Sequence, residues 1–124
     1  MSPTAFALIV TGVLLNATAQ LLLKAGVKVT GQIDLSGAHL WSAARALAFE
    51  PHILGGLLCY VASVIVWILA LSRVEVSIAY PMLSIGYIVT AVAAWHLFGE
   101  SLTATRVAGI AVIIAGVYLV ARSG

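Results

Sequence analysis

The chain has 124 residues, of which 63% are hydrophobic and only 8% are charged. A soluble domain carries roughly 25% charged residues, and a core of this size cannot hide so much apolar surface from water. The composition therefore excludes an ordinary soluble domain and indicates an integral membrane protein. The net charge of +2 is too small to indicate a nucleic-acid partner.

Four long segments are almost free of charged residues. A membrane-spanning helix needs about 20 mostly apolar residues, and the sequence predicts such helices over about residues 4–23, 50–71, 76–98 and 102–121. The prediction is an all-α integral membrane protein, with residues 1–124 forming a single four-helix transmembrane domain. Because short turns join the last three helices, we expect them to be antiparallel neighbours in sequence order.

A more polar connection follows the first predicted helix. Lys24 and Lys28 are expected to end that helix at a membrane surface, and residues 31–37 predict a loop. Apolar residues then recur at helical spacing over residues 36–49, with Trp41 among them. This pattern favours either a short helix lying in the interface plane or a loop with one helical turn.

The first helix carries a polar stripe. Asn16, Gln20 and Lys24 are spaced four residues apart and therefore share one helix face. An amide in hydrocarbon is costly without a partner, so Asn16 and Gln20 serve either helix packing or a polar pathway. Neutral amides can bind a sugar or phosphate head group, but they cannot take up and release protons near neutral pH. Lys24 is either an interface anchor or a phosphate ligand at the mouth of a cavity.

A second polar stripe lies on the third predicted helix. Ser77, Tyr80, Ser84 and Tyr87 are three, four and three residues apart, so they share one face. Pro81 lies among them, and because proline lacks an amide hydrogen we expect a kink that serves as a hinge. Kinked membrane helices often line substrate cavities. We expect this face to meet the polar face of the first helix across a cavity; the alternative is hydrogen bonding between packed helices.

The fourth predicted helix has a face of small residues. Gly109 and Gly116 are seven residues apart, so both lie on this face. Small residues let helix backbones approach closely in lipid. Four helices enclose too little volume for a large substrate, so we predict dimerisation through this face, the alternative being packing within the protomer. The sequence contains no recognisable metal site, cofactor motif or nucleophile–base set, so no metal, no cofactor and no enzyme is predicted.

Basic residues divide unevenly between the two predicted membrane surfaces. One surface receives Lys24, Lys28, Arg45 and Arg106, and the other receives Arg73 and Arg122. The positive-inside rule therefore favours a topology in which both chain ends lie outside the cytoplasm.

Five stretches in order resemble the small multidrug resistance family of the drug/metabolite transporter superfamily: LLNATAQLLLK, CYVAS, SIAY, FGE and GIAVIIAGV. The resemblance implies a four-helix protomer that works as a dimer, often antiparallel. It also implies helix pairing through Gly109 and Gly116, and a substrate-cavity tyrosine at Tyr80. Drug exporters of this family carry an essential glutamate where this chain has Asn16, and a tryptophan where it has Leu83. Proton-coupled export of aromatic cations needs a titratable carboxylate, which the first helix does not supply.

The stretch IAYPMLS, together with Gln20 and Lys24, is closer to the branch that flips aminoarabinose-phosphoundecaprenol in bacteria, although the segment 29–50 is longer here. The resemblance implies a flippase, or a flippase subunit, for a polyprenyl-phosphate-linked sugar or a similar amphipathic lipid. It implies a multi-pass protein of the bacterial inner membrane that contacts membrane lipid and forms a homodimer or a heterodimer with a paralogous subunit. Two alternatives are an exporter of small cations or metabolites with the same fold and a non-transporting subunit of a membrane complex.

Overall fold

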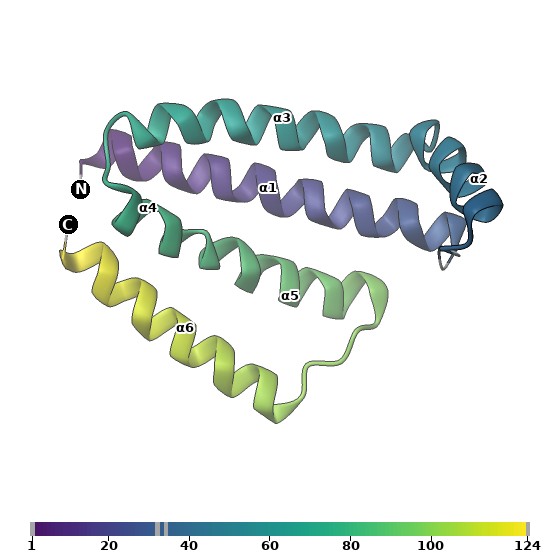
Figure 1. The fold of residues 1–124 in the computed structure, drawn as a ribbon. Helices are drawn as coiled ribbons and strands as arrows, with labels where there is room; N and C mark the ends of the chain where they lie inside the picture. Colours follow the sequence, from purple (N-terminus) through teal and green to yellow (C-terminus); the bar gives the residue numbers. More distant parts are fainter. Residues whose placement is uncertain (1, 32, 34, 124) are drawn as a thin grey trace.

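The computed structural model describes residues 2–31, 33 and 35–123, and all regular secondary structure in these residues is helical. The helices are α1 (Pro3–Thr30), α2 (Gly37–Ala48), α3 (Pro51–Leu71), α4 (Val76–Met82), α5 (Ser84–Phe98) and α6 (Ala104–Ser123) (Figure 1). Four stretches are long and apolar enough to cross a membrane: α1, α3, α4 with α5, and α6. The prediction of an all-α membrane protein with four spanning helices is confirmed.

The first helix is longer than predicted. α1 has 28 residues and ends at Thr30, so the prediction that Lys24 and Lys28 end it is wrong. A helix of this length extends about 42 Å, against a hydrocarbon core of about 30 Å. Residues 25–27 continue the helix because α3 packs beside them, and Gly26 is buried there against Ile53. The two lysines are therefore exposed side chains on a continuous helix.

The connection between α1 and α3 contains the predicted short helix. α2 covers 12 residues, and its Trp41 side chain is 69% exposed. The prediction of a short helix within residues 36–49 is thus confirmed, and its position in the interface plane stays a prediction. Of the predicted loop at residues 31–37, Gln32 and Asp34 lie outside the described residues.

Helices α1 and α3 form the most closely packed pair. Gly12, Ala19 and Gly26 of α1 are seven residues apart and all lie against α3. A Cβ atom added to Gly56 of α3 would approach the carbonyl oxygen of Ala19 to 3.1 Å. Small residues on both helices therefore allow the two backbones to lie close together, as they do in many membrane proteins.

The order of neighbouring helices differs from the prediction. α1 lies between α3 and α5, and among the described residues α3 contacts α4 slightly and does not contact α5. Gly86 of α5 packs instead on Val13 and Ala17 of α1. The prediction that the last three spans are sequential neighbours holds for the third span and α6, because α6 contacts both α4 and α5, whereas α3 touches the third span only slightly, at α4. The reason is that α1 presents small or compact residues on two faces, and α3 and α5 occupy one face each.

The third span is broken where Pro81 predicts a kink. α4 ends at Met82 and α5 begins at Ser84. The amide of Leu83 donates to the carbonyl of Tyr80 at 3.0 Å, a tighter turn than the α-helical one. Proline supplies no amide hydrogen, so the helical bond from residue 81 to the Ser77 carbonyl is missing, and the break at Leu83 follows two residues later.

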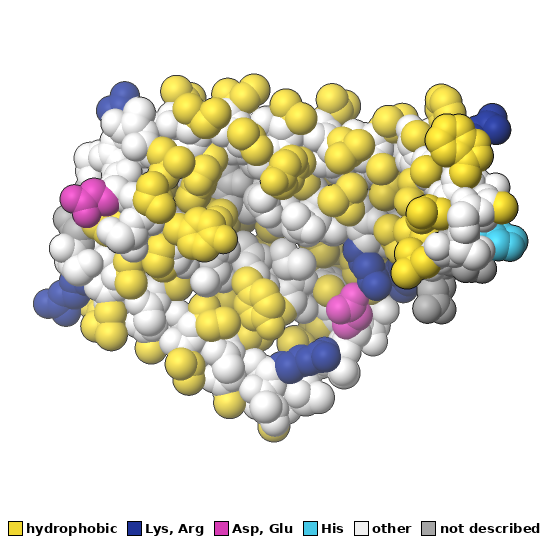
Figure 2. All heavy atoms as spheres, in the orientation of Figure 1, with side chains coloured by type: hydrophobic (Ala, Val, Ile, Leu, Met, Phe, Trp, Pro, Cys, Tyr) yellow, Lys and Arg dark blue, Asp and Glu magenta, His cyan; other side chains and the backbone are white. Residues whose placement is uncertain are grey.

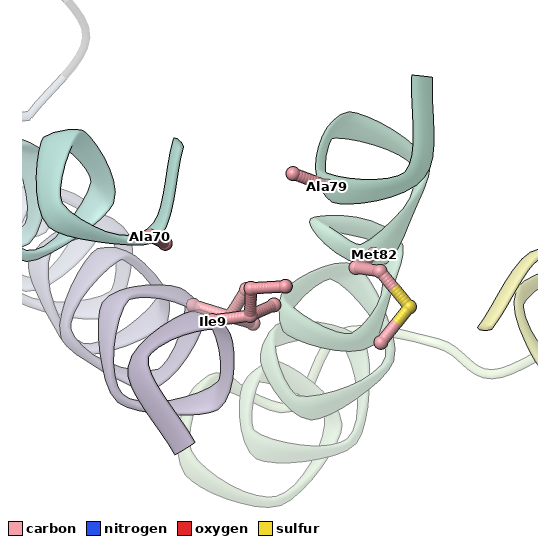
Figure 3. Close-up of a cluster of buried hydrophobic side chains, with 5 residues drawn as sticks. Ile9, Ala70, Ala79 and Met82 are labelled. Carbon is pink, nitrogen blue, oxygen red and sulfur yellow. The ribbon is translucent and has the colours of Figure 1, made fainter. Parts of the chain in front are cut away.

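The buried core lies at one end of the bundle. Ile9 of α1, Ala70 of α3 and Ala79 of α4 point toward one another there, and Met82 of α4 belongs to the same buried cluster (Figure 3). α6 packs against this cluster through Val117 and no residue of α6 is fully buried. Away from that contact, α6 and α5 diverge in the direction of residues 99–103, which connect the two helices (Figure 1).

Candidate functional site

A groove of about 170 Å³ opens beside Asn16, near the middle of α1. Its floor comes from α1, one wall from α3, and its far side from the residue between α4 and α5. The lining residues are Gly12, Asn16, Tyr60, Ser63, Val64, Trp67 and Leu83. Asn16 is half-buried in this groove. Asn16 and Leu83, the residue at the break in the third span, line the same groove. They therefore lie at the same level of the bundle.

The chemistry of this groove is neutral and polar. Asn16 offers an amide, Tyr60 a phenol and Trp67 an indole N–H. The hydroxyl of Ser63 donates to the carbonyl oxygen of Tyr60 at 2.6 Å, so its oxygen is left to accept a hydrogen bond. No carboxylate is among the lining residues of this groove. The groove can therefore bind hydroxyl-rich groups and has no carboxylate to carry protons.

Sequence reasoning missed the wall that α3 contributes. Tyr60, Ser63 and Trp67 are three and four residues apart and share one face of a helix that is otherwise apolar. This polar and aromatic spacing is the signal that identifies them, and it is as clear as the stripe on the first helix.

Gln20 and Lys24 continue the Asn16 face toward the end of α1 that carries α2. Both are exposed, and neither lines the groove. At the same end the Lys28 Nζ atom lies 5.1 Å from the centre of the Phe98 ring of α5. The end of α1 thus places two further basic side chains beyond the groove.

Within one protomer, the polar stripe of the third span does not meet the polar stripe of the first. Ala79 and Met82 are the α4 residues buried against α1, whereas Ser77 is exposed and Tyr80 is 66% exposed. Ser84 is half-buried and does not line the Asn16 groove. The lining of the Asn16 groove contains none of Ser77, Tyr80, Ser84 and Tyr87, and the joint role of the two stripes stays a prediction.

Tyr87 lies elsewhere, in a second pocket of about 270 Å³ between α5 and α6. The other lining residues are Thr90, Ala91, Ala94, Glu100, Ser101, Leu102, Arg106 and Ile110. Unlike the Asn16 groove, this pocket contains one acidic and one basic side chain.

Gly109 and Gly116 face away from the rest of the protomer. Both are exposed, and a Cβ atom added to either would meet nothing within 4 Å. The alternative that these glycines pack within the protomer is therefore wrong. Their face is free to receive another helix.

Glu50 is a buried acidic residue at the junction of α2 and α3. It caps α3, because its Oε2 atom accepts from the Ile53 amide at 3.0 Å, and its Oε1 atom lies 2.9 Å from His52 Nδ1. The hydrogen bond with His52 lowers the pKa of Glu50 below its ordinary value of 4.5. The Ile53 amide adds to the lowering, and desolvation opposes it. Glu50 therefore caps α3, and its hydrogen bonds favour the charged form of its own carboxyl group.

Comparison with known proteins identifies the family. The EamA-like transporter family matches residues 2–122, which is nearly the whole chain. The chain belongs to this family. Its resemblance to the drug/metabolite transporters is confirmed, and it is a multi-pass membrane protein of a transporter family.

Three similar curated relatives carry the names of flippase subunits. A protein of Shewanella sediminis named probable 4-amino-4-deoxy-L-arabinose-phosphoundecaprenol flippase subunit ArnF is 34% identical, over 87% of this chain and 81% of its own length. A protein of Sodalis glossinidius with the same name is 39% identical, over 87% and 83%. A Pseudomonas aeruginosa protein named as subunit ArnE is 40% identical, over 67% and 61%. No solved structure matches the chain.

Proposed function

We propose that this protein is a flippase, or a flippase subunit, for a polyprenyl-phosphate-linked sugar in a bacterial inner membrane. The observation that carries the proposal is the neutral groove beside Asn16, at mid-depth of the spans and without a carboxylate. Such a groove suits a sugar that must cross hydrocarbon and does not suit proton-coupled cation export. The relatives named as aminoarabinose-phosphoundecaprenol flippase subunits support the same substrate class.

The working unit in this proposal is a dimer. A groove of about 170 Å³ is smaller than the ~300–1,000 Å³ of small-molecule sites, so one protomer does not enclose a substrate. The stripe of the third span would then complete the site from a second protomer, with Ser77, Tyr80 and Tyr87 exposed and Ser84 half-buried. Gly109 and Gly116 provide the contact face. Because both subunit names occur among the relatives, the pair is either a homodimer, for which the family resemblance implies an antiparallel arrangement, or a heterodimer with a paralogous subunit.

Transport in this proposal follows from the broken helix. The sugar binds to Asn16 and Gln20 while the polyprenyl tail stays in the bilayer, and Lys24 neutralises the phosphate at one mouth. The break after Pro81 acts as a hinge, so that the two protomers rock about the substrate and expose it to alternate sides. No titratable group is required for this motion.

The test is flipping of a fluorescent polyprenyl-phosphate sugar in proteoliposomes, with and without a protonophore. Asn16→Leu removes hydrogen bonds worth about 1–3 kcal/mol, so we expect the flipping rate to fall about tenfold or more. Thr18→Leu is the matched control, because Thr18 lies on an exposed face of α1 and its hydroxyl donates only to the carbonyl of Leu14. The protonophore should have no effect on the wild-type rate.

Other results would redirect the proposal. Equal flipping by the Asn16 and Thr18 variants would remove the groove from the pathway. Uptake of cations driven by a proton gradient would favour the exporter. Flipping that appears only after a second subunit is added would make this chain half of a heterodimer.

A further inference from the structure

The second pocket, between α5 and α6, has a chemistry that the Asn16 groove lacks. It combines the Glu100 carboxylate and the Arg106 guanidinium with the hydroxyls of Tyr87, Thr90 and Ser101. Figure 2 shows basic and acidic side chains close to one another where α5 and α6 diverge, on a surface that is otherwise mostly hydrophobic. Glu100 and Arg106 are both exposed at the connection between α5 and α6, so their charges are available to a ligand that enters this pocket.

The local backbone holds Glu100 and Arg106 at the rim of this pocket. Gly99 has a left-handed backbone (φ 67°), and the Glu100 amide donates to the carbonyl of Ala94 at 3.3 Å. This turn folds Glu100 back over the last turn of α5. From the other side, Arg106 Nη1 donates to the carbonyl of Ser101 at 2.6 Å, which draws the guanidinium toward the connection.

Glu100 and Arg106 do not satisfy each other. Among the described residues no ion pair joins them, although both line the pocket. Arg106 uses Nη1 on Ser101 and keeps its other N–H groups for a further acceptor. The pocket therefore presents a donor for an anion and an acceptor for a cation at two separate places.

We propose that this pocket binds a lipid head group that carries both a phosphate and a primary amine. Arg106 contacts the phosphate, for which a guanidinium offers several aligned donors. Glu100 contacts the ammonium group, and the hydroxyls of Tyr87 and Thr90 contact the remainder of the head group. A volume of about 270 Å³ holds a head group but no long tail, and the divergence of α5 from α6 lets the tail leave sideways into the bilayer.

The pocket opens at the end of the bundle with more basic residues, where Lys28 lies over Phe98. The positive-inside rule favours the cytoplasmic surface for this end. The pocket is thus suited to capture a head group from the cytoplasmic leaflet before the sugar reaches the Asn16 groove. This role in transport rests on the proposed function, whereas binding by itself does not.

Two lipids share the required chemistry: an amino-sugar polyprenyl phosphate and phosphatidylethanolamine. The experiment is native mass spectrometry of the purified protein, titrated with each of these and with a polyprenyl phosphate that bears a neutral sugar. Arg106→Gln should weaken binding of all three lipids about tenfold, because each loses its phosphate contact. Glu100→Gln should weaken only the two amine-bearing lipids, by a similar factor. The lipid with the higher affinity for the wild type identifies the source of the head group.

Matched variants separate this site from general charge effects. Arg122→Gln removes the same charge at the other end of α6, and Glu75→Gln removes an exposed acid before α4; neither should change binding. Thr90→Val removes a pocket hydroxyl without touching the 99–103 connection, so it tests the site even if Arg106→Gln disturbs that connection. We expect Thr90→Val to weaken binding of the preferred lipid about threefold to tenfold.

The inference is overturned if Glu100→Gln affects the neutral-sugar lipid as much as the amine-bearing lipids, or if Arg106→Gln and Thr90→Val both bind like the wild type. Failure of the proposed function gives a different result. In that case the binding pattern of the Glu100 and Arg106 variants stands, but the wild-type protein flips no polyprenyl-phosphate sugar. Asn16→Leu should slow flipping about tenfold or more and leave binding at this pocket unchanged.

Discussion

Replacing Gly116 with leucine should separate assembly from folding. A Cβ atom on Gly116 meets nothing within 4 Å in the protomer, so the larger side chain costs the protomer no contact. Leucine also has a helix propensity about 1 kcal/mol better than glycine. The isolated protomer should therefore be as stable as the wild type or slightly more stable.

The dimer should respond in the opposite direction. If the glycine face packs against a second helix, an added side chain forces the backbones apart at about 1–3 kcal/mol per copy. A homodimer contains the substitution twice, so its dissociation constant should rise by at least about 30-fold. A heterodimer contains it once, so its loss of affinity should be about half as large in free energy.

The assay is single-molecule photobleaching in liposomes over a range of protein densities, with thermal unfolding as the measure of protomer stability. Ala111→Leu is the control, because Ala111 is exposed on α6 and lies about 160° around the helix from Gly109. Dissociation by the Ala111 variant and normal dimers in the Gly116 variant would refute the assignment of this face. If Gly116→Leu and Ala111→Leu lowered the thermal stability equally, the two exposed faces of α6 would not differ, and neither would carry a specific contact.

Three further predictions concern folding and motion. Gly26→Val should lower stability by about 1–3 kcal/mol in a thermal or steric-trapping assay, because its Cβ atom would lie 2.6 Å from Ile53 Cγ1 and 2.7 Å from Glu50 Oε2. The hydrogen bond with His52 lowers the pKa of Glu50 in the folded state below 4.5. The stabilisation by Glu50 is therefore fully present above pH 4.5, and it is lost as the pH falls from 4.5 through the folded-state pKa. A Tm series from pH 7 to 3 should show this loss, and Glu50→Gln should remove it. Pro81→Ala restores an amide donor, so it should straighten the third span and slow flipping while substrate binding is kept.

Each of these predictions has a contradicting result. Gly37→Val is the control for Gly26, because a Cβ atom there meets nothing within 4 Å, and equal losses in both variants would contradict the packing argument. A Tm that falls equally in wild type and Glu50→Gln would assign the acid sensitivity to another group. Wild-type flipping by Pro81→Ala would exclude the break as a hinge.

Composition and local chemistry by themselves determined most of the architecture. The near absence of charge predicted the four spans, because a charged side chain in hydrocarbon is expensive wherever its helix packs. Pro81 predicts a kink in the third span, and the structure has a break two residues later, at Leu83. The short helix α2 was one of two alternatives, since its apolar spacing suits a helix but its length is marginal. The resemblance to the transporter family also came from local sequence stretches.

The tertiary structure decided which faces meet. Helical periodicity shows that Asn16 and Tyr80 each lie on a polar face, but it does not show what either face opposes. In a membrane, lipid tails are as apolar as a neighbouring helix, so hydropathy does not distinguish a lipid-facing surface from a packed one. The neighbours are selected by close contact between small residues, and Gly12, Gly26 and Gly86 place α1 between α3 and α5. This arrangement brings α3 to Asn16 and leaves the stripe of Tyr80 exposed.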